Sequence, residues 1–341
     1  MKRLYPWQQE PWQRWAGLRA RLPHAILLKG PQGTGKLAFA MHLAQSLLCE
    51  RPQDDGLACQ DCPSCRWFGQ ETHPDFRLLQ PDALAEVEEG EEREAGKKKP
   101  SRQISVDQVR ALADFANLSA HQGGHRVVLI HPAEAMNSSA ANALLKTLEE
   151  PSGRMILILV SHKPQQLLPT ILSRCVALAM PMPSPEASRA WLKQQGLANS
   201  AALLAQAGFA PLTAAQLAEE GTGTEEYRRL LQELGQPAGL DALALAEQLQ
   251  RAEPAQIIHW LQQWCYDLGS AQLTGRVRYH LELADGIRAL ARQVGALDLA
   301  AYQKELLAAR REAQHPLNPK LLFESLFLSY RQLTPERTAR K

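Results

Sequence analysis

The sequence predicts an α/β domain with a parallel sheet, followed by an all-α region. Short apolar runs at 25–28 (AILL), 127–130 (VVLI) and 155–160 (MILILV) alternate with helical patterns such as 37–48 (LAFAMHLAQSLL). That alternation is typical of a parallel sheet with helices on its faces. Beyond about residue 188 the strand signals end, and a Leu/Ala/Gln-rich helical periodicity continues to about Tyr330.

Breaks in the pattern divide the 341 residues into three parts, a size that suits two or three domains. The proline-rich string PMPSPEAS (181–188) marks the first boundary, and EEGTGTEE (219–226) marks the second. We therefore expect a sheet domain at 1–180, a small helical domain at 181–222 and a larger helical domain at 223–341. Within the first, residues 81–101 carry an acidic block followed by three lysines, and we expect a solvated, mobile loop there.

The composition excludes several classes of protein. There are 38 basic and 36 acidic side chains, and a net charge of +2 is too balanced for a protein that grips nucleic acid through its own phosphate contacts alone. The N-terminus has no apolar signal core, and the apolar runs are far shorter than the roughly 20 residues of a membrane helix. We expect a soluble, cytoplasmic protein, whose six cysteines are thiols or metal ligands rather than disulfides.

Residues 30–37 (GPQGTGKL) follow the first apolar run and open a helix, which is the context that a phosphate loop requires. Glycines let the backbone wrap close to a phosphate, and the N–H groups and a lysine supply positive charge. Position 37, where the motif needs a Ser or Thr to ligate magnesium, is Leu. The loop residues fit either residual nucleotide binding or a turn that the fold still needs. The candidate nucleotide-binding residues are Gly30, Gly33, Thr34, Gly35 and Lys36.

The second apolar strand ends in His131-Pro132. In phosphate-loop enzymes these places hold an Asp that binds the hydrated magnesium and a Glu that orients the attacking water. Magnesium prefers oxygen donors, so an imidazole is a poor substitute and proline offers no ligand. Glu134 lies at least two residues beyond the expected place and is more simply a turn residue. Magnesium binding and ATP hydrolysis by this chain are therefore not expected.

Four cysteines have the spacing C-x9-C-x2-C-x2-C, and they are Cys49, Cys59, Cys62 and Cys65. Two overlapping C-x2-C steps let the thiolates converge on one tetrahedral ion, and four thiolates saturate Zn²⁺ without leaving a position for substrate. The pattern predicts a structural zinc module at 49–65. Free thiols or an iron-sulfur cluster are the alternatives. Cys175 and Cys265 stand apart as ordinary thiols.

Several strings together resemble the delta prime family of bacterial DNA polymerase III clamp-loader subunits, which are AAA+ proteins. Besides the phosphate loop and the cysteine cluster, they are LYPW (4–7), THPDF (72–76), SAANALLKTLEEP (139–151), TILSRC (170–175) and NPKLLFESLFL (318–328). The ATP-hydrolysing gamma/tau relatives share the cysteine cluster and TILSRC. Those relatives carry acids where this chain has His131-Pro132, and an arginine that GFAPLTA (208–214) lacks.

The resemblance implies an architecture and a function. The sheet domain would be RecA-like, 181–222 would be the lid, and 223–341 would join the collar of a hetero-pentameric ring with gamma/tau and delta subunits. The ring loads the sliding clamp onto primed DNA during replication. The resemblance also implies that this subunit is not an enzyme by itself. Its Arg174, in TILSRC, would reach the ATP of a neighbouring subunit, where a guanidinium stabilises charge on the transferring phosphoryl group.

Two other functions stay open at this point. One is an active gamma/tau-like clamp-loader ATPase with an unconventional magnesium site. The other is a zinc-dependent DNA-binding protein, which the near-neutral charge and the closed thiolate site disfavour. The ring order, the residues that touch the clamp or DNA, and the roles of the zinc module and of the 81–101 loop do not follow from the sequence.

Overall fold

The computed structural model describes residues 3–85, 100–117, 124–151, 153–197, 199–219, 225–313 and 318–334. The chain forms two compact units, Met1–Ala187 and Ser188–Lys341, which divide inside the predicted proline-rich boundary. Most of the loop expected at 81–101 lies outside the described residues.

The first unit is built on a five-stranded sheet in the order β2-β3-β4-β1-β5, and every pair is parallel. This confirms the predicted α/β class with a parallel sheet. The strands are β1 (Ala25–Lys29), β2 (Phe76–Leu79), β3 (Arg126–Ile130), β4 (Met155–Ser161) and β5 (Val176–Ala179). The three central strands are the three predicted apolar runs. The edge strands β2 and β5 escaped prediction because they are only four residues long and largely exposed.

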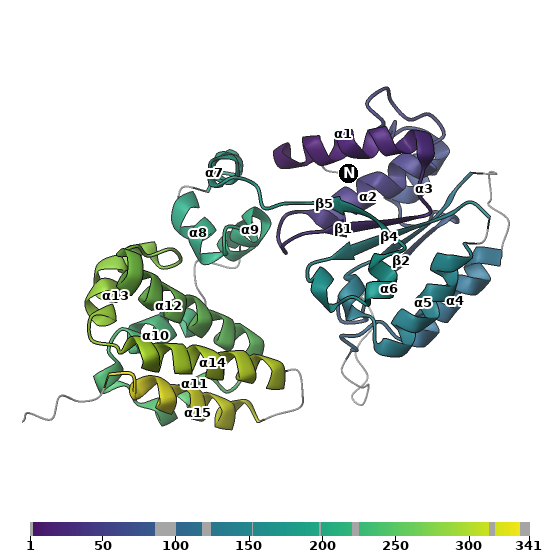
Figure 1. Cartoon of the computed structure of the whole chain (residues 1–341). Helices are drawn as coiled ribbons and strands as arrows, with labels where there is room; N and C mark the ends of the chain where they lie inside the picture. Colours follow the sequence, from purple (N-terminus) through teal and green to yellow (C-terminus); the bar gives the residue numbers. More distant parts are fainter. Residues whose placement is uncertain are drawn as a thin grey trace, which may run out of the picture. The chain divides into compact units, whose positions relative to one another are not determined.

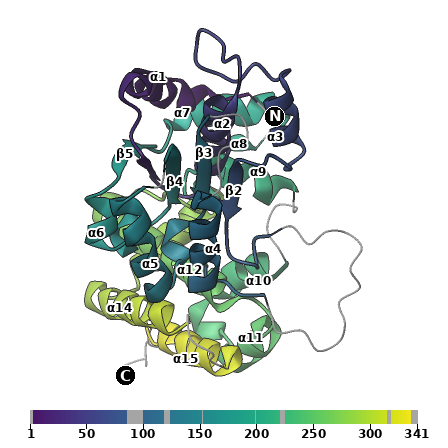
Figure 2. The same ribbon diagram turned by 90° about the vertical axis from the view of Figure 1, so that its right-hand side faces the viewer.

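Helices cover both faces of the sheet, as Figures 1 and 2 show. The helices of this unit are α1 (Gln9–Leu18), α2 (Lys36–Leu48), α3 (Pro63–Gly69), α4 (Val106–Asn117), α5 (Ser138–Glu149) and α6 (Pro169–Leu172). The described residues of this unit also form 3-10 turns, which are η1 (Pro6–Gln8), η2 (Arg19–Arg21), η3 (Ala133–Ala135) and η4 (Pro164–Gln166).

Alternate residues of each buried strand pack on opposite faces, because successive side chains of a strand point to opposite sides. In β1, Ile26 and Leu28 join the core beneath α1–α3, whereas Leu27 joins the core beneath α4–α6. Burial on both faces explains why the central strands are continuous apolar runs rather than alternating ones.

Helix α5 is amphipathic. Its side chains Ala140, Leu144 and Leu148 are buried, while Asn142 and Lys146 are exposed. The side chain of Asn137 caps its first turn by accepting the N–H of Ala140. Because α5 is ordered from cap to end, its last residue, Glu149, has a defined place beside α6.

The second unit contains only helices among its described residues. They are α7 (Pro185–Gln194), α8 (Ser200–Gln206), α9 (Pro211–Glu219), α10 (Glu225–Leu234), α11 (Ala242–Leu249), α12 (Pro254–Thr274), α13 (Ala284–Ala291), α14 (Ala296–Glu312) and α15 (Pro319–Arg331), with 3-10 turns η5 (Pro237–Gly239) and η6 (Leu281–Leu283). Helix α7 begins in the first unit and runs into the second. No single described helix is long and apolar enough to cross a membrane, although the bent pair α8 and α9 passes that test by length and composition.

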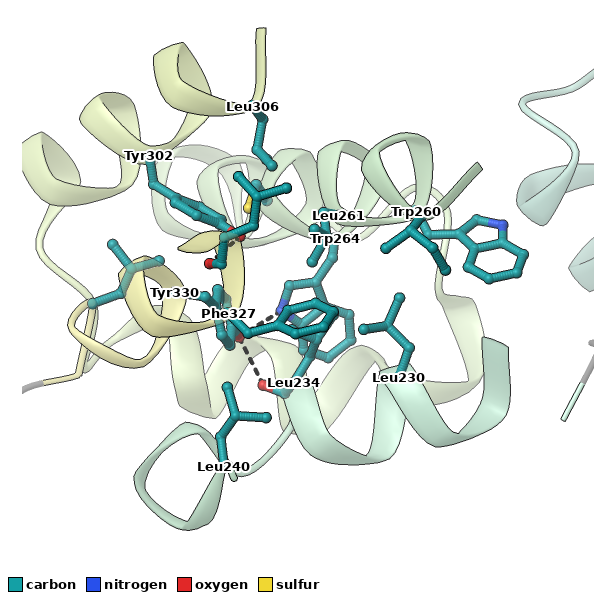
Figure 3. Packing of buried hydrophobic residues seen from close by; sticks show 14 of the residues in the cluster. Leu230, Leu234, Leu240, Trp260, Leu261, Trp264, Tyr302, Leu306, Phe327 and Tyr330 are labelled. Carbon is teal, nitrogen blue, oxygen red and sulfur yellow. Dashed lines mark hydrogen bonds between the residues drawn. The ribbon is translucent and has the colours of Figure 1, made fainter. Parts of the chain in front are cut away.

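The larger helical core, formed by α10–α15, contains a chain of buried hydrogen bonds (Figure 3). Trp264 donates its indole N–H to the Tyr330 hydroxyl, and this hydroxyl donates to the carbonyl of Leu234, both at 2.7 Å. Three helices that are distant in the sequence are thereby joined, α12, α15 and α10. Helices α7–α9 have a separate small core around Leu192, Leu203 and Leu204. A division of this unit into lid and collar remains a prediction.

Candidate functional site

The phosphate loop connects β1 to α2, as the sequence predicts. Gly33 and Gly35 have φ values of 75° and 83°, which favour glycine. A Cβ atom on Gly30 would lie 2.0 Å from the backbone oxygen of Met180. The loop therefore needs its glycines for backbone geometry and close packing.

The N-terminal segment packs directly on this loop. Trp7 donates its indole N–H to the Thr34 carbonyl at 2.9 Å, and Gln8 donates its side-chain amide to the Gly35 carbonyl at 2.8 Å. A Cβ atom on Gly35 would lie 2.7 Å from the ring of Tyr5. These contacts give Gly35 a structural role that requires no nucleotide.

Lys36 is turned into the protein. The residue is 2% exposed, and its ammonium donates to the Pro31 carbonyl of the same loop. Burial lowers the pKa of Lys36 to about 8, and the carboxylate of Glu134 partly offsets that shift. The Lys36 ammonium therefore bonds to the loop itself, whereas the lysine of an intact phosphate loop reaches a bound phosphate.

Imidazoles stand at the ends of two neighbouring strands. His131 directly follows β3 and His162 directly follows β4, and their ring centroids lie 5.3 Å apart in an edge-on arrangement. Burial lowers the pKa of both residues, that of His162 to about 4, and the Lys36 ammonium lowers both further. Both rings are therefore neutral at neutral pH. Only the parallel pairing of β3 with β4 brings the two histidines together.

Glu134 has a structural partner. One of its carboxylate oxygens, Oε1, accepts the backbone N–H groups of His162 and Lys163 at 2.9 and 3.1 Å. It thus ties the turn after β3 to the turn after β4. Its place in the short turn η3 agrees with the prediction of a turn residue, although it is partly buried rather than fully solvated.

The remaining position of the magnesium apparatus is apolar. Leu37 is half-buried and packs against the core on the α1–α3 face of the sheet. Oxygen ligands for a hydrated magnesium ion are therefore missing at positions 37 and 131, the acid that would orient water is missing at position 132, and imidazole is a poor ligand for this hard ion. These residues therefore do not fit the magnesium ion that a phosphate-loop fold would imply.

The four predicted cysteines do converge. The Sγ atoms of Cys49, Cys59, Cys62 and Cys65 all lie within 4.8 Å of one another. The Cys49–Cys62 and Cys59–Cys65 pairs are 4.0 and 3.9 Å apart, close to the roughly 3.8 Å expected between thiolates bound tetrahedrally to zinc. The set could hold a metal ion.

Backbone amides and burial act in opposite directions on these thiols. The N–H groups of Asp61 and Cys62 lower the pKa of Cys59 to about 6, whereas burial raises the pKa of Cys49. A buried thiolate needs a compensating cation, and a bound metal ion supplies it. The cluster is chemically suited to zinc.

A hydrogen-bonded chain braces the cysteine module. The backbone N–H of Asp75 donates to His73 Nδ1 at 3.0 Å, so that the other ring nitrogen carries the proton and faces Ser64 Oγ at 2.8 Å. Ser64 donates to the carbonyl of Leu48 at 2.6 Å. His73 is thus a satisfied buried histidine, and its partner Ser64 joins α3 to the end of α2 beside Cys49.

Arg174 follows α6 and is partly exposed. Its Nη2 donates to Oε1 of Glu149 at 2.5 Å, and its Nη1 donates to the Thr170 carbonyl at 3.0 Å and to Ser173 Oγ at 3.3 Å. The sequence predicts Arg174 as a site residue but does not predict its partner Glu149, because 25 residues separate the two.

Comparisons with known proteins agree with this picture. Residues 12–184 match the family described as DNA polymerase III, delta subunit, and residues 223–332 match DNA polymerase III, delta subunit, C terminal. The DNA polymerase III subunit delta prime of Pseudomonas aeruginosa PAO1 is 41% identical, over 98% of this chain and 99% of that protein. The subunit delta prime of Escherichia coli K12 is 30% identical, over 80% and 79% respectively.

Among solved structures, a gamma-subunit-related protein of DNA polymerase III from Thermotoga maritima is 19% identical over 96% of this chain and 99% of that one, with a TM-score of 0.43. This solved structure carries no part of the family relationship, which is shown by the Pseudomonas relative, matched over nearly the entire chain, and by the family model for residues 12–184. The chain belongs to the delta prime subunit family of DNA polymerase III.

Proposed function

We propose that this chain is a non-hydrolysing delta prime subunit of a clamp loader. It assembles in the cytoplasm with gamma/tau and delta subunits in a hetero-pentameric ring, and it helps that ring to place the sliding clamp on primed DNA during replication. Membership of the delta prime family supports the role in DNA polymerase III.

One observation supports the proposal that this chain does not hydrolyse ATP. Leu37, His131 and Pro132 occupy the three positions that would hold magnesium and orient water, and the nearest acid, Glu134, is bonded to the backbone of the next turn. The inward Lys36 supports the same conclusion, because its ammonium is bonded to the carbonyl of its own loop.

The chain contributes to catalysis through Arg174. In the assembled ring this guanidinium reaches the ATP of a neighbouring gamma/tau subunit and stabilises charge in the transition state. Its position supports this role: Arg174 lies at the end of α6 with its side chain about one-third exposed. The four cysteines bind one structural zinc ion, and the second unit divides into a lid (181–222) and a collar domain (223–341).

ATP turnover tests the proposal. We expect none by the isolated chain above the level of contaminants, and we expect that Leu37→Thr alone does not create it, because His131 and Pro132 remain. The assembled ring should hydrolyse ATP at its gamma/tau sites. Magnesium-dependent turnover by the isolated wild-type chain would contradict the proposal if it disappears in Lys36→Ala and persists in the control Lys29→Ala. Lys29 is exposed at the end of β1.

A further inference from the structure

We infer that Glu149 is a positioning residue that aims the Arg174 guanidinium at the neighbouring subunit's ATP. The inference rests on the proposed role of Arg174 in trans. Glu149 is the last residue of α5, and Arg174 lies just beyond α6. Because α5 and α6 pack together in one unit, the carboxylate has a fixed place relative to the arginine.

The arginine is held by three acceptors in one arrangement. The Thr170 carbonyl and Ser173 Oγ take the two N–H groups of Nη1, and Glu149 takes one N–H of Nη2. The first two acceptors belong to α6 and its C-terminal turn, so they move with the arginine. Glu149 is the acceptor that links the guanidinium to a different helix, α5.

The arrangement leaves part of the guanidinium available. Arginine has five N–H donors, and three are used here. The Nε–H and the second Nη2–H have no partner among the residues that the structure describes. Two free donors on a planar, permanently charged group suit a phosphate oxygen.

The stability of the chain does not explain an acid at position 149. Both side chains of the pair are substantially exposed, 34% for Arg174 and 50% for Glu149, and such ion pairs contribute little to folding. A carboxylate at the C-terminal end of a helix is also disfavoured by the helix dipole. A local conflict of this kind is expected at functional positions.

Orientation is what the pair can supply. A free arginine side chain samples many rotamers, and ordering it at the moment of reaction costs free energy. Electrostatic catalysis depends on groups that are already aimed before the charge develops. Glu149 restricts the guanidinium before a neighbour's ATP arrives.

Single-turnover ATP hydrolysis by the assembled ring tests this inference. Loss of the acceptor in Glu149→Ala should slow hydrolysis at the adjacent site roughly 10- to 100-fold, the scale of a misplaced catalytic group, with little change in the ATP concentration for half-maximal rate. Glu149→Gln should recover most of the rate, because its amide oxygen still accepts the hydrogen bond. The control Glu150→Ala, at the next exposed acid, should react at the wild-type rate.

A double-mutant cycle separates aiming from a general structural effect. If Glu149 acts through Arg174, the double variant Glu149→Ala/Arg174→Ala should be no slower than Arg174→Ala. Equal slowing by Glu149→Ala in both backgrounds, or a wild-type rate for Glu149→Ala, would overturn the inference. If Arg174→Ala itself reacts at the wild-type rate, both the trans role and this inference fail. If Arg174→Ala is slow and Glu149→Ala is not, only this inference fails.

Discussion

Lys36, the lysine of the phosphate loop, has an environment unlike that of a surface lysine. Its ammonium is buried and faces the Pro31 carbonyl instead of solvent. Neutral His131 and His162 lie near it and add no charge. The folded state therefore contains the protonated form of Lys36 but does not stabilise it relative to the unfolded state.

Lys36 should make the stability of the protein depend on pH. Its pKa is lowered in the folded chain to about 8 from an ordinary value of 10.5. Between these values the unfolded chain holds more protons, so the folded state gains stability as pH rises from about 8 to 10.5, by at most about 1.4 kcal/mol per pH unit. Lys36→Met removes this gain.

Denaturant unfolding of wild type and Lys36→Met at pH 7.5 and 9.5 measures the effect. The free energy of unfolding of wild type relative to Lys36→Met should increase with pH. Lys29→Met, which changes an exposed lysine, should show no such trend. A difference between wild type and Lys36→Met that is the same at both pH values would show that burial of Lys36 does not control its protonation.

The cysteine module is an element whose structure we expect to depend on metal. It has few apolar side chains of its own, and its small buried cluster consists of the cysteines and Ala58. Binding of zinc and local folding are therefore linked. We expect one zinc ion per chain in protein purified without added metal.

Removal of one ligand should remove the metal. Cys59→Ser should lower the zinc content well below one per chain and make the segment at 49–65 sensitive to protease, as should a strong chelator. Cys175→Ser is the matched control, because Cys175 lies outside the cluster and should leave the zinc content unchanged. Full zinc occupancy in Cys59→Ser would exclude the four-thiolate site.

The larger helical core contains a second element-level test. Tyr330→Phe removes the hydroxyl that satisfies both the Trp264 indole and the Leu234 carbonyl. Leaving buried polar groups without partners costs about 1–3 kcal/mol, so the free energy of unfolding of this core should fall by that amount. Denaturant unfolding followed by tryptophan fluorescence measures it. Tyr266→Phe, at a residue that is 43% exposed, should have little effect, and equal losses in both variants would refute the explanation.

On the scale of the whole molecule, Arg174 matters only in the assembly. Arg174→Ala should leave the folded chain and its melting temperature nearly unchanged, because a partly exposed ion pair adds little stability. In the assembled ring it should slow ATP hydrolysis at the adjacent gamma/tau site, and arginine fingers in related systems contribute roughly 10³ to 10⁵ in rate.

Single-turnover hydrolysis and clamp loading onto primed DNA are the suitable measurements, because other active sites in the ring would dilute the loss in a steady-state rate. Arg174→Lys should rescue only partly, since an ammonium keeps the charge and loses the planar fork. Wild-type hydrolysis and loading by a fully assembled Arg174→Ala ring would return Arg174 to the status of a surface residue.

The sequence by itself determined the class of the fold and the losses in the nucleotide site. The three apolar runs became the three central strands, since burial on both faces leaves a continuous apolar signal in one dimension. Leu37 could be read as a lost magnesium ligand from the phosphate-loop motif, and His131 and Pro132 could be read as lost acids because phosphate-loop enzymes assign a chemical role to both places after the second apolar strand. The cysteine spacing likewise carried its own geometry, since short C-x2-C steps bring thiols together locally.

Only the tertiary structure decided which distant residues meet. The edge strands β2 and β5 depend on pairing with a sheet that already exists, so their own short sequences carry little signal. Parallel pairing placed His131 beside His162 and gave Glu134 its backbone partners. Packing of α5 on α6 placed Glu149 against Arg174. Such contacts join residues 25 to 31 positions apart, and periodicity and spacing along a chain do not encode them.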